Sequence, residues 1–135
     1  MQPALQKQKS VVPTSCHQVE SCVVDMTCHK FWQHIRALKF HELCPNAVTN
    51  TMWMEGGMEG MVGSTATIHY KDGAKWTVLV TEISDKHHTL CYDVIYTDHE
   101  LPAHGVQVTF ECSPVTFTNQ TYVRWTTDFS NDADA

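Results

Sequence analysis

Long apolar runs, clustered positive charge and a signal-peptide core are all missing from this chain of 135 residues. No apolar run approaches the roughly 20 residues that cross a bilayer as a helix, so no membrane span is expected. Nine Lys and Arg stand against fifteen Asp and Glu, and the basic residues are scattered. This balance argues against nucleic acid as a partner, because phosphate-backbone affinity needs clustered basic side chains. The expectation is one soluble, cytoplasmic domain.

Closely spaced cysteine pairs are also missing. The six cysteines show neither C-x-x-C spacing nor the density of a disulfide scaffold, and they stand at Cys16, Cys22, Cys28, Cys44, Cys91 and Cys112. Such a pattern suits a reducing compartment, so reduced thiols are expected.

Recognisable catalytic and metal motifs are absent as well. The chain has no G-x-S-x-G elbow, and its glycine run lacks the Lys-Ser/Thr pair of a phosphate loop. Adjacent pairs such as His87-His88 would point to opposite faces of a strand, which leaves His99 and His104 as the one pair that could meet across a loop. We therefore expect no metal and no cofactor.

Two short helices are predicted early in the chain, after a polar tail over residues 1–13 and a first strand over Cys16–Val24. Behind Thr27, a possible cap, Phe31, Trp32, Ile35 and Leu38 recur at three- and four-residue spacing and share one helix face. A second helical turn over His41–Cys44 should end at Pro45.

The rest of the domain, which spans residues 14–135, reads as strand and turn. Apolar and polar residues alternate with period two, as in Leu90, Tyr92, Val94 and Tyr96 against Cys91, Asp93, Ile95 and Thr97. This alternation indicates an antiparallel sheet with one apolar face and one solvent-exposed polar face. The further strands are predicted over Thr49–Glu55, Ser64–Tyr70, Trp76–Ile83, Leu90–Thr97, Val106–Ser113 and Tyr122–Phe129.

This element order resembles the Bet v 1-like superfamily, which is related to START domains and to polyketide cyclases (SRPBCC). Phe31-Trp32 resembles its aromatic position in the first helix, Gly57-Met58-Glu59-Gly60-Met61-Val62-Gly63 resembles its glycine turn, and Val123–Phe129 with Trp125 resembles its last strand. The resemblance implies an α+β helix-grip fold, in which a curved antiparallel sheet of about seven strands encloses a ligand cavity.

The resemblance also implies a long closing helix after Phe129, but the sequence stops at Ala135. We therefore expect most of that helix to be missing. A homodimer contact or an exchanged segment would then cover the apolar face of the sheet, because monomers rarely expose such a wide apolar surface.

The apolar face is the first candidate site. From alternation alone it would be an ordinary filled core, whereas the resemblance implies that it binds a ligand. Its residues are Ala66, Ile68, Tyr70, Trp76, Val78, Val80, Tyr92, Val94, Val108, Phe110 and Trp125.

Three functions fit this face. Binding or carriage of a small hydrophobic or amphipathic molecule, without covalent chemistry, is favoured. A cyclase-like enzyme is the first alternative, with His41, Glu82 and Tyr92 as the acid-base residues to test first. A non-catalytic module that docks a partner helix is the second.

Overall fold

Seven antiparallel strands and two short helices make up the part of the chain that the computed structural model describes, residues 17–98 and 105–129. The strands are β1 (His17–Val24), β2 (Val48–Trp53), β3 (Thr65–Tyr70), β4 (Lys75–Ser84), β5 (Thr89–Thr97), β6 (Val106–Val115) and β7 (Gln120–Phe129). The helices are α2 (Cys28–Arg36) and α3 (Phe40–Leu43), and both lie between β1 and β2. The predicted helix-grip α+β order is therefore confirmed. The polar tail and the pair His99 and His104 lie outside the described residues.

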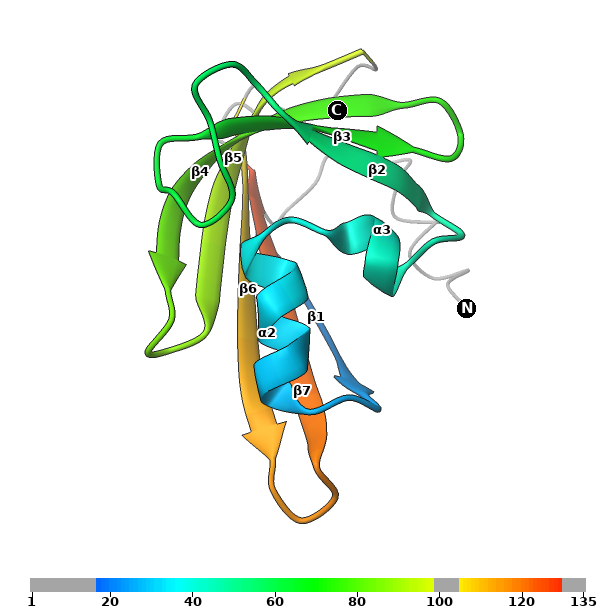
Figure 1. The fold of residues 1–135 in the computed structure, drawn as a ribbon, viewed down its shortest axis with the longest axis vertical. Helices are drawn as coiled ribbons and strands as arrows, with labels where there is room; N and C mark the ends of the chain where they lie inside the picture. The colour runs from blue at the N-terminus through cyan, green and yellow to red at the C-terminus, as the bar shows by residue number, and fades with distance from the viewer. Residues whose placement is uncertain (1–16, 99–104, 130–135) are drawn as a thin grey trace.

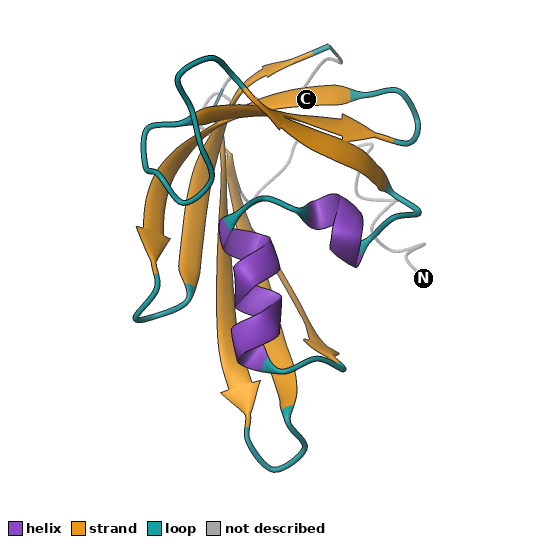
Figure 2. Cartoon of the chain, viewed as in Figure 1, coloured by secondary structure: helices purple, strands orange, loops and turns teal. Residues whose placement is uncertain are grey.

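One curved sheet holds all seven strands, in the order β1-β7-β6-β5-β4-β3-β2 (Figure 1). Strands β2 to β7 form a meander, and β1 pairs with β7, so that β1 and β2 are the two edges. The sheet curls around α2 and α3, which lie on its inner side (Figure 2). That inner, concave face carries the apolar residues of the alternating pattern. Among the described residues, no helix follows β7, and neither helix is long and apolar enough to cross a membrane.

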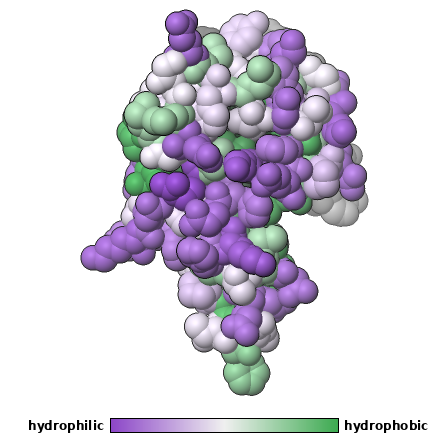
Figure 3. All heavy atoms as spheres, viewed as in Figure 1, coloured by the Kyte–Doolittle hydropathy of each residue, from purple (hydrophilic) through white to green (hydrophobic). Residues whose placement is uncertain are grey.

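Helix α2 packs its apolar stripe against the sheet. Phe31, Trp32 and Ile35 are buried, as the three- and four-residue spacing predicts, while the opposite face is polar. Most of the surface seen in Figure 3 is hydrophilic, and the hydrophobic atoms show in small separate areas. Thr27 occupies the N-cap position, although its side chain makes no capping hydrogen bond.

Leu38 differs from its prediction in one respect. It lies beyond the last helical residue, with φ at 56°, yet it is fully buried. A left-handed backbone is unfavourable for leucine, and burial of its side chain in the core offsets that cost. The helix therefore ends two residues before the apolar pattern does.

Irregularities in β4 and β5 change which residues face inward. On β5, Val94 pairs with Val78 but Tyr96 pairs with Thr77, so Ile95 is an extra residue. Such a bulge reverses the alternation that follows it. Tyr96, predicted to share a face with Leu90, Tyr92 and Val94, is consequently 62% exposed on the outer, convex face. That part of the prediction is wrong.

A polar contact fixes α2 to the turn between β4 and β5. The buried indole N–H of Trp32 donates to Oδ1 of Asp85 at 2.8 Å, and Nε of Arg36 donates to the same oxygen at 2.9 Å. The hydrogen bonds from Trp32 and then Arg36 hold the pKa of Asp85 below its ordinary value of 3.8. Among the described residues, the Asp85 carboxylate is therefore the only acceptor for the buried N–H of Trp32.

Replacing Asp85 tests this contact. Asp85→Ala should lower the free energy of unfolding by about 1–3 kcal/mol, because it leaves the Trp32 N–H buried without an acceptor. Asp85→Asn keeps an oxygen for Trp32 and should cost less. Urea unfolding followed by tryptophan fluorescence gives both values, and equal losses in the two variants would show that the Trp32 hydrogen bond contributes little.

The same carboxylate should make stability depend on pH. A carboxyl group whose folded pKa is lowered stabilises the fold above its unfolded pKa, and this contribution is lost as the pH falls through the folded pKa. The stability difference between wild type and Asp85→Asn should thus be full at neutral pH and shrink below about pH 4. A difference that stays constant down to about pH 2 would contradict this assignment.

Candidate functional site

The concave face brings together all eleven residues that the sequence predicted for a binding surface. Strand pairing aligns them across neighbouring strands, for example Ile68 with Trp76, Val80 with Tyr92, Tyr92 with Val108 and Phe110 with Trp125. Seven of them are buried core residues, and four remain half-buried. The buried seven are Ala66, Ile68, Val78, Val80, Tyr92, Val94 and Val108.

The four half-buried residues are all aromatic, and we call them the concave aromatic cluster: Tyr70, Trp76, Phe110 and Trp125. They form two groups. Tyr70 and Trp76 meet edge to face with ring centroids 5.7 Å apart, at the β3–β4 end of the face. Phe110 lies 6.3 Å from Trp125 on the neighbouring strand and 5.5 Å from Phe40 of α3. These rings keep accessible apolar area, which is what separates a binding surface from a filled core.

Two tyrosines place phenol groups on this apolar face. Burial raises the pKa of Tyr92 far above its ordinary value, and the pKa of Tyr70 is raised by burial and then by the charge of Asp72. Both phenols are therefore protonated at neutral pH. In this state each O–H can donate a hydrogen bond but cannot act as a general base.

His41 belongs to α3, the short helix that packs against β2. Its Nδ1 atom is buried and has no hydrogen-bond partner among the described residues. A buried ring nitrogen without a partner is costly, and a bound ligand or water would satisfy it. Of the three candidate acid-base residues, His41 is the one with such an atom.

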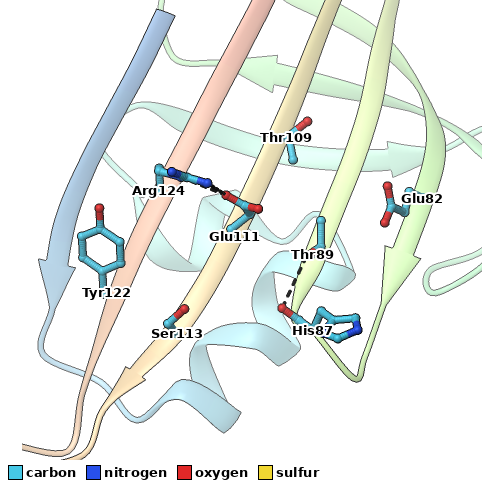
Figure 4. A pocket seen from close by; sticks show the side chains of 8 residues that line it. All are labelled: Glu82, His87, Thr89, Thr109, Glu111, Ser113, Tyr122 and Arg124. Carbon is cyan, nitrogen blue, oxygen red and sulfur yellow. Dashed lines mark hydrogen bonds and ion pairs between the residues drawn. The ribbon is translucent and has the colours of Figure 1, made fainter.

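Glu82 lies on the other side of the sheet. With strict alternation from Trp76, Glu82 would share the concave face with Val80. Thr81 is an extra residue in β4, however, so that Glu82 pairs with Cys91 and points to the convex face. There Glu82 lines an open groove of about 570 Å³ (Figure 4). The groove is crossed by the ion pair between Arg124 and Glu111. The structure therefore does not bring His41, Glu82 and Tyr92 together.

A cysteine–histidine contact, which sequence reasoning missed, lies where the first residue of α2 meets the turn between β4 and β5. Sγ of Cys28 is 3.4 Å from Nδ1 of His88, and His88 packs on Trp32 with ring centroids 5.5 Å apart. Burial raises the pKa of the Cys28 thiol, and burial together with Cys28 raises the pKa of Cys112 to about 12. Both thiols are protonated at neutral pH, so neither is an activated nucleophile.

Among residues 17–98 and 105–129, no three His, Cys, Asp or Glu side chains gather as metal ligands would. All five cysteines in these ranges are free.

Comparison with known proteins identifies the fold. No protein-family model matches the chain, and no curated protein matches it in sequence. Among solved structures, ginseng major latex-like protein 151 from Panax ginseng matches with a TM-score of 0.73 at 13% identity, over 89% of this chain and 80% of that one. A protein from Nitrosospira multiformis matches with a TM-score of 0.68 at 18% identity, over 84% and 78% of the two chains.

Norcoclaurine synthase from Thalictrum flavum, solved with dopamine and hydroxybenzaldehyde, matches with a TM-score of 0.63 at 13% identity. The match covers 88% of this chain and 69% of the synthase. The chain thus has the Bet v 1-like fold, and the resemblance seen in its sequence is confirmed at that level. At these identities the likeness concerns the fold alone.

The burial of Tyr92 can be tested by titration. Its phenol should stay protonated up to about pH 11 as long as the protein is folded. Native wild type and Tyr92→Phe should consequently show the same rise in phenolate absorbance, whereas after denaturation the variant should show one phenolate fewer. A smaller native rise in Tyr92→Phe would mean that the phenol is accessible.

Proposed function

We propose that this protein binds a small hydrophobic or amphipathic molecule on the concave face of its sheet. The observation that carries the proposal is the concave aromatic cluster, whose four rings share one face and keep part of their surface accessible. Burial of apolar area stabilises a complex by about 25 cal/mol per Å², and aromatic side chains bring about 150–250 Å² each. A ligand placed against these rings covers surface that the chain itself leaves open.

Polar groups near the cluster favour an amphipathic ligand. Tyr70 belongs to the cluster, and Tyr92 packs on Phe110 with ring centroids 6.3 Å apart. Their protonated phenols can donate hydrogen bonds to a carbonyl, ether or hydroxyl oxygen of a ligand. A few such groups in an apolar surround are typical of small-molecule sites.

The fold supports the same function. Norcoclaurine synthase was solved with two small aromatic molecules, so a chain with this fold is able to take such compounds. Binding is favoured over cyclase-like catalysis because Glu82 faces away from the concave face and the Tyr92 phenol is protonated. Free cysteines accord with a cytoplasmic location. The remaining alternative is an interaction module, in which a partner segment or a second copy covers the same rings.

A dye titration tests the binding surface. We expect 1-anilinonaphthalene-8-sulfonate to bind folded protein and to quench tryptophan fluorescence, because Trp76 and Trp125 line the face. Phe110→Ala should weaken the dye about 5- to 10-fold, which corresponds to the loss of about 1–1.4 kcal/mol of ring contact.

Phe117→Ala is the matched control. Phe117 is 98% exposed in the turn between β6 and β7, so the same truncation there removes no contact with the concave face. Circular dichroism must first show that both variants are folded. Equal dye affinity in the two variants would place the dye elsewhere and remove support for the proposed site, whereas displacement of the dye by an amphipathic helical peptide alone would favour the interaction module.

A further inference from the structure

The edge strand β1 has features that the opposite edge, β2, does not share. All but one of its eight residues are exposed, it contains neither Pro, Gly nor Lys, and its register with β7 is unbroken from His17 to Val24. Edge β2 has a register shift between Val48 and Asn50, and α3 packs against it. Bulges and covering elements protect sheet edges from pairing with other chains. Among the described residues, nothing pairs with the outer edge of β1.

The side chains on the convex face of β1 are unusually apolar for an exposed strand. Val19 is 49% exposed and Val23 is 54% exposed, and both point to this face together with His17 and Ser21. The order along this face is therefore apolar, small, apolar, from Val19 through Ser21 to Val23.

This order is self-complementary. We infer that two copies of this chain pair antiparallel through β1, with Ser21 of each copy on the two-fold axis, and so join two sheets into one. In this register Val19 lies opposite Val23 of the second copy, and Val23 lies opposite its Val19. The directly opposed valines bury apolar area that each copy alone leaves exposed, and this burial stabilises the pair.

Symmetry and charge select this register over its neighbours. Two antiparallel edge strands that are related by a two-fold axis present the same sheet face on the same side. Directly opposed residues must therefore both point to that face, and this requires the axis to pass between a residue and its own copy. An axis at Glu20 would set Glu20 against its own copy, and like charges directly opposite each other are destabilising. An axis at Cys22 would set Val23 against Ser21 of the second copy. Only the axis at Ser21 pairs both valines with valines.

The inferred contact uses the edge of the sheet and not its concave face. It is therefore a different interface from the one that would cover the concave aromatic cluster, and it is independent of the proposed ligand. Backbone N–H and C=O groups along β1 find partners in it, which is the usual source of affinity in strand addition.

Sedimentation equilibrium of the full chain tests the pairing. Wild type should show a species of twice the 15.3 kDa chain mass at about 50 μM. Val19→Lys should raise the dimer dissociation constant at least about tenfold, since each dimer contains the substituted contact twice. Met52→Lys is the matched control, because Met52 is a 56% exposed apolar residue on the other edge strand. It should leave the dimer unchanged.

Cross-linking tests the register. In a Cys16→Ser, Cys22→Ser, Cys44→Ser background, Ser21→Cys should form an intermolecular disulfide on mild oxidation, because directly opposed residues have Cα atoms about 4.5–5.5 Å apart. Ser113→Cys, an exposed position on β6, is the control and should not. A monomer throughout the concentration range, or a dimer that is insensitive to Val19→Lys, would overturn the inference. Rapid cross-linking through the native Cys22, without cross-linking of Ser21→Cys, would overturn the register.

Discussion

Everything in this structure depends on how one face of a strongly curved sheet is kept from water. Period-two alternation places apolar side chains from β3 to β7 on the concave side, and an antiparallel sheet with such a face is stable only when another layer covers it. Helix α2 supplies part of that layer through Trp32 and Ile35, and Leu38 extends it beyond the helix. The contact of Trp32 and Arg36 with Asp85 fixes α2 against the turn between β4 and β5.

The extent of this cover decides which part of the concave face stays accessible. Several of its side chains are fully buried, as Val78 and Val80 are. The rings of the concave aromatic cluster are only half-buried, although they belong to the same face. The proposed site is thus the part of the hydrophobic core that the two helices cover incompletely.

Most elements could be predicted because each of them follows from one local pattern. The spacing of Phe31, Trp32 and Ile35 predicted α2, and alternation predicted the strands to within a few residues. The errors arise where a single inserted residue changes the pattern. Ile95 moves Tyr96 to the convex face, and Thr81 does the same to Glu82. A bulge has no distinctive residue type here, so alternation alone could not reveal it.

The candidate site was predictable as a surface but not as a set of polar contacts. Alternation identifies which side chains share the face, whereas the Cys28–His88 contact joins residues that are 60 positions apart. Contacts of this kind depend on how α2 lies against the turn between β4 and β5 and on the positive φ of His88, neither of which has a local signal.

The two faces of β1 show why the edge and the binding surface are separate. On the concave side β1 presents Gln18, Glu20 and Cys22, all exposed, and it packs against the core only at its last residue, Val24. On the convex side it presents Val19 and Val23, next to Thr126 and Tyr122 of β7. A strand that continued the core along its whole length would carry its valines on the inner side. Two of the three valines of β1, Val19 and Val23, are instead on the outer side, where no described residue buries them, and this reversal of the alternation suits β1 to pairing with another chain.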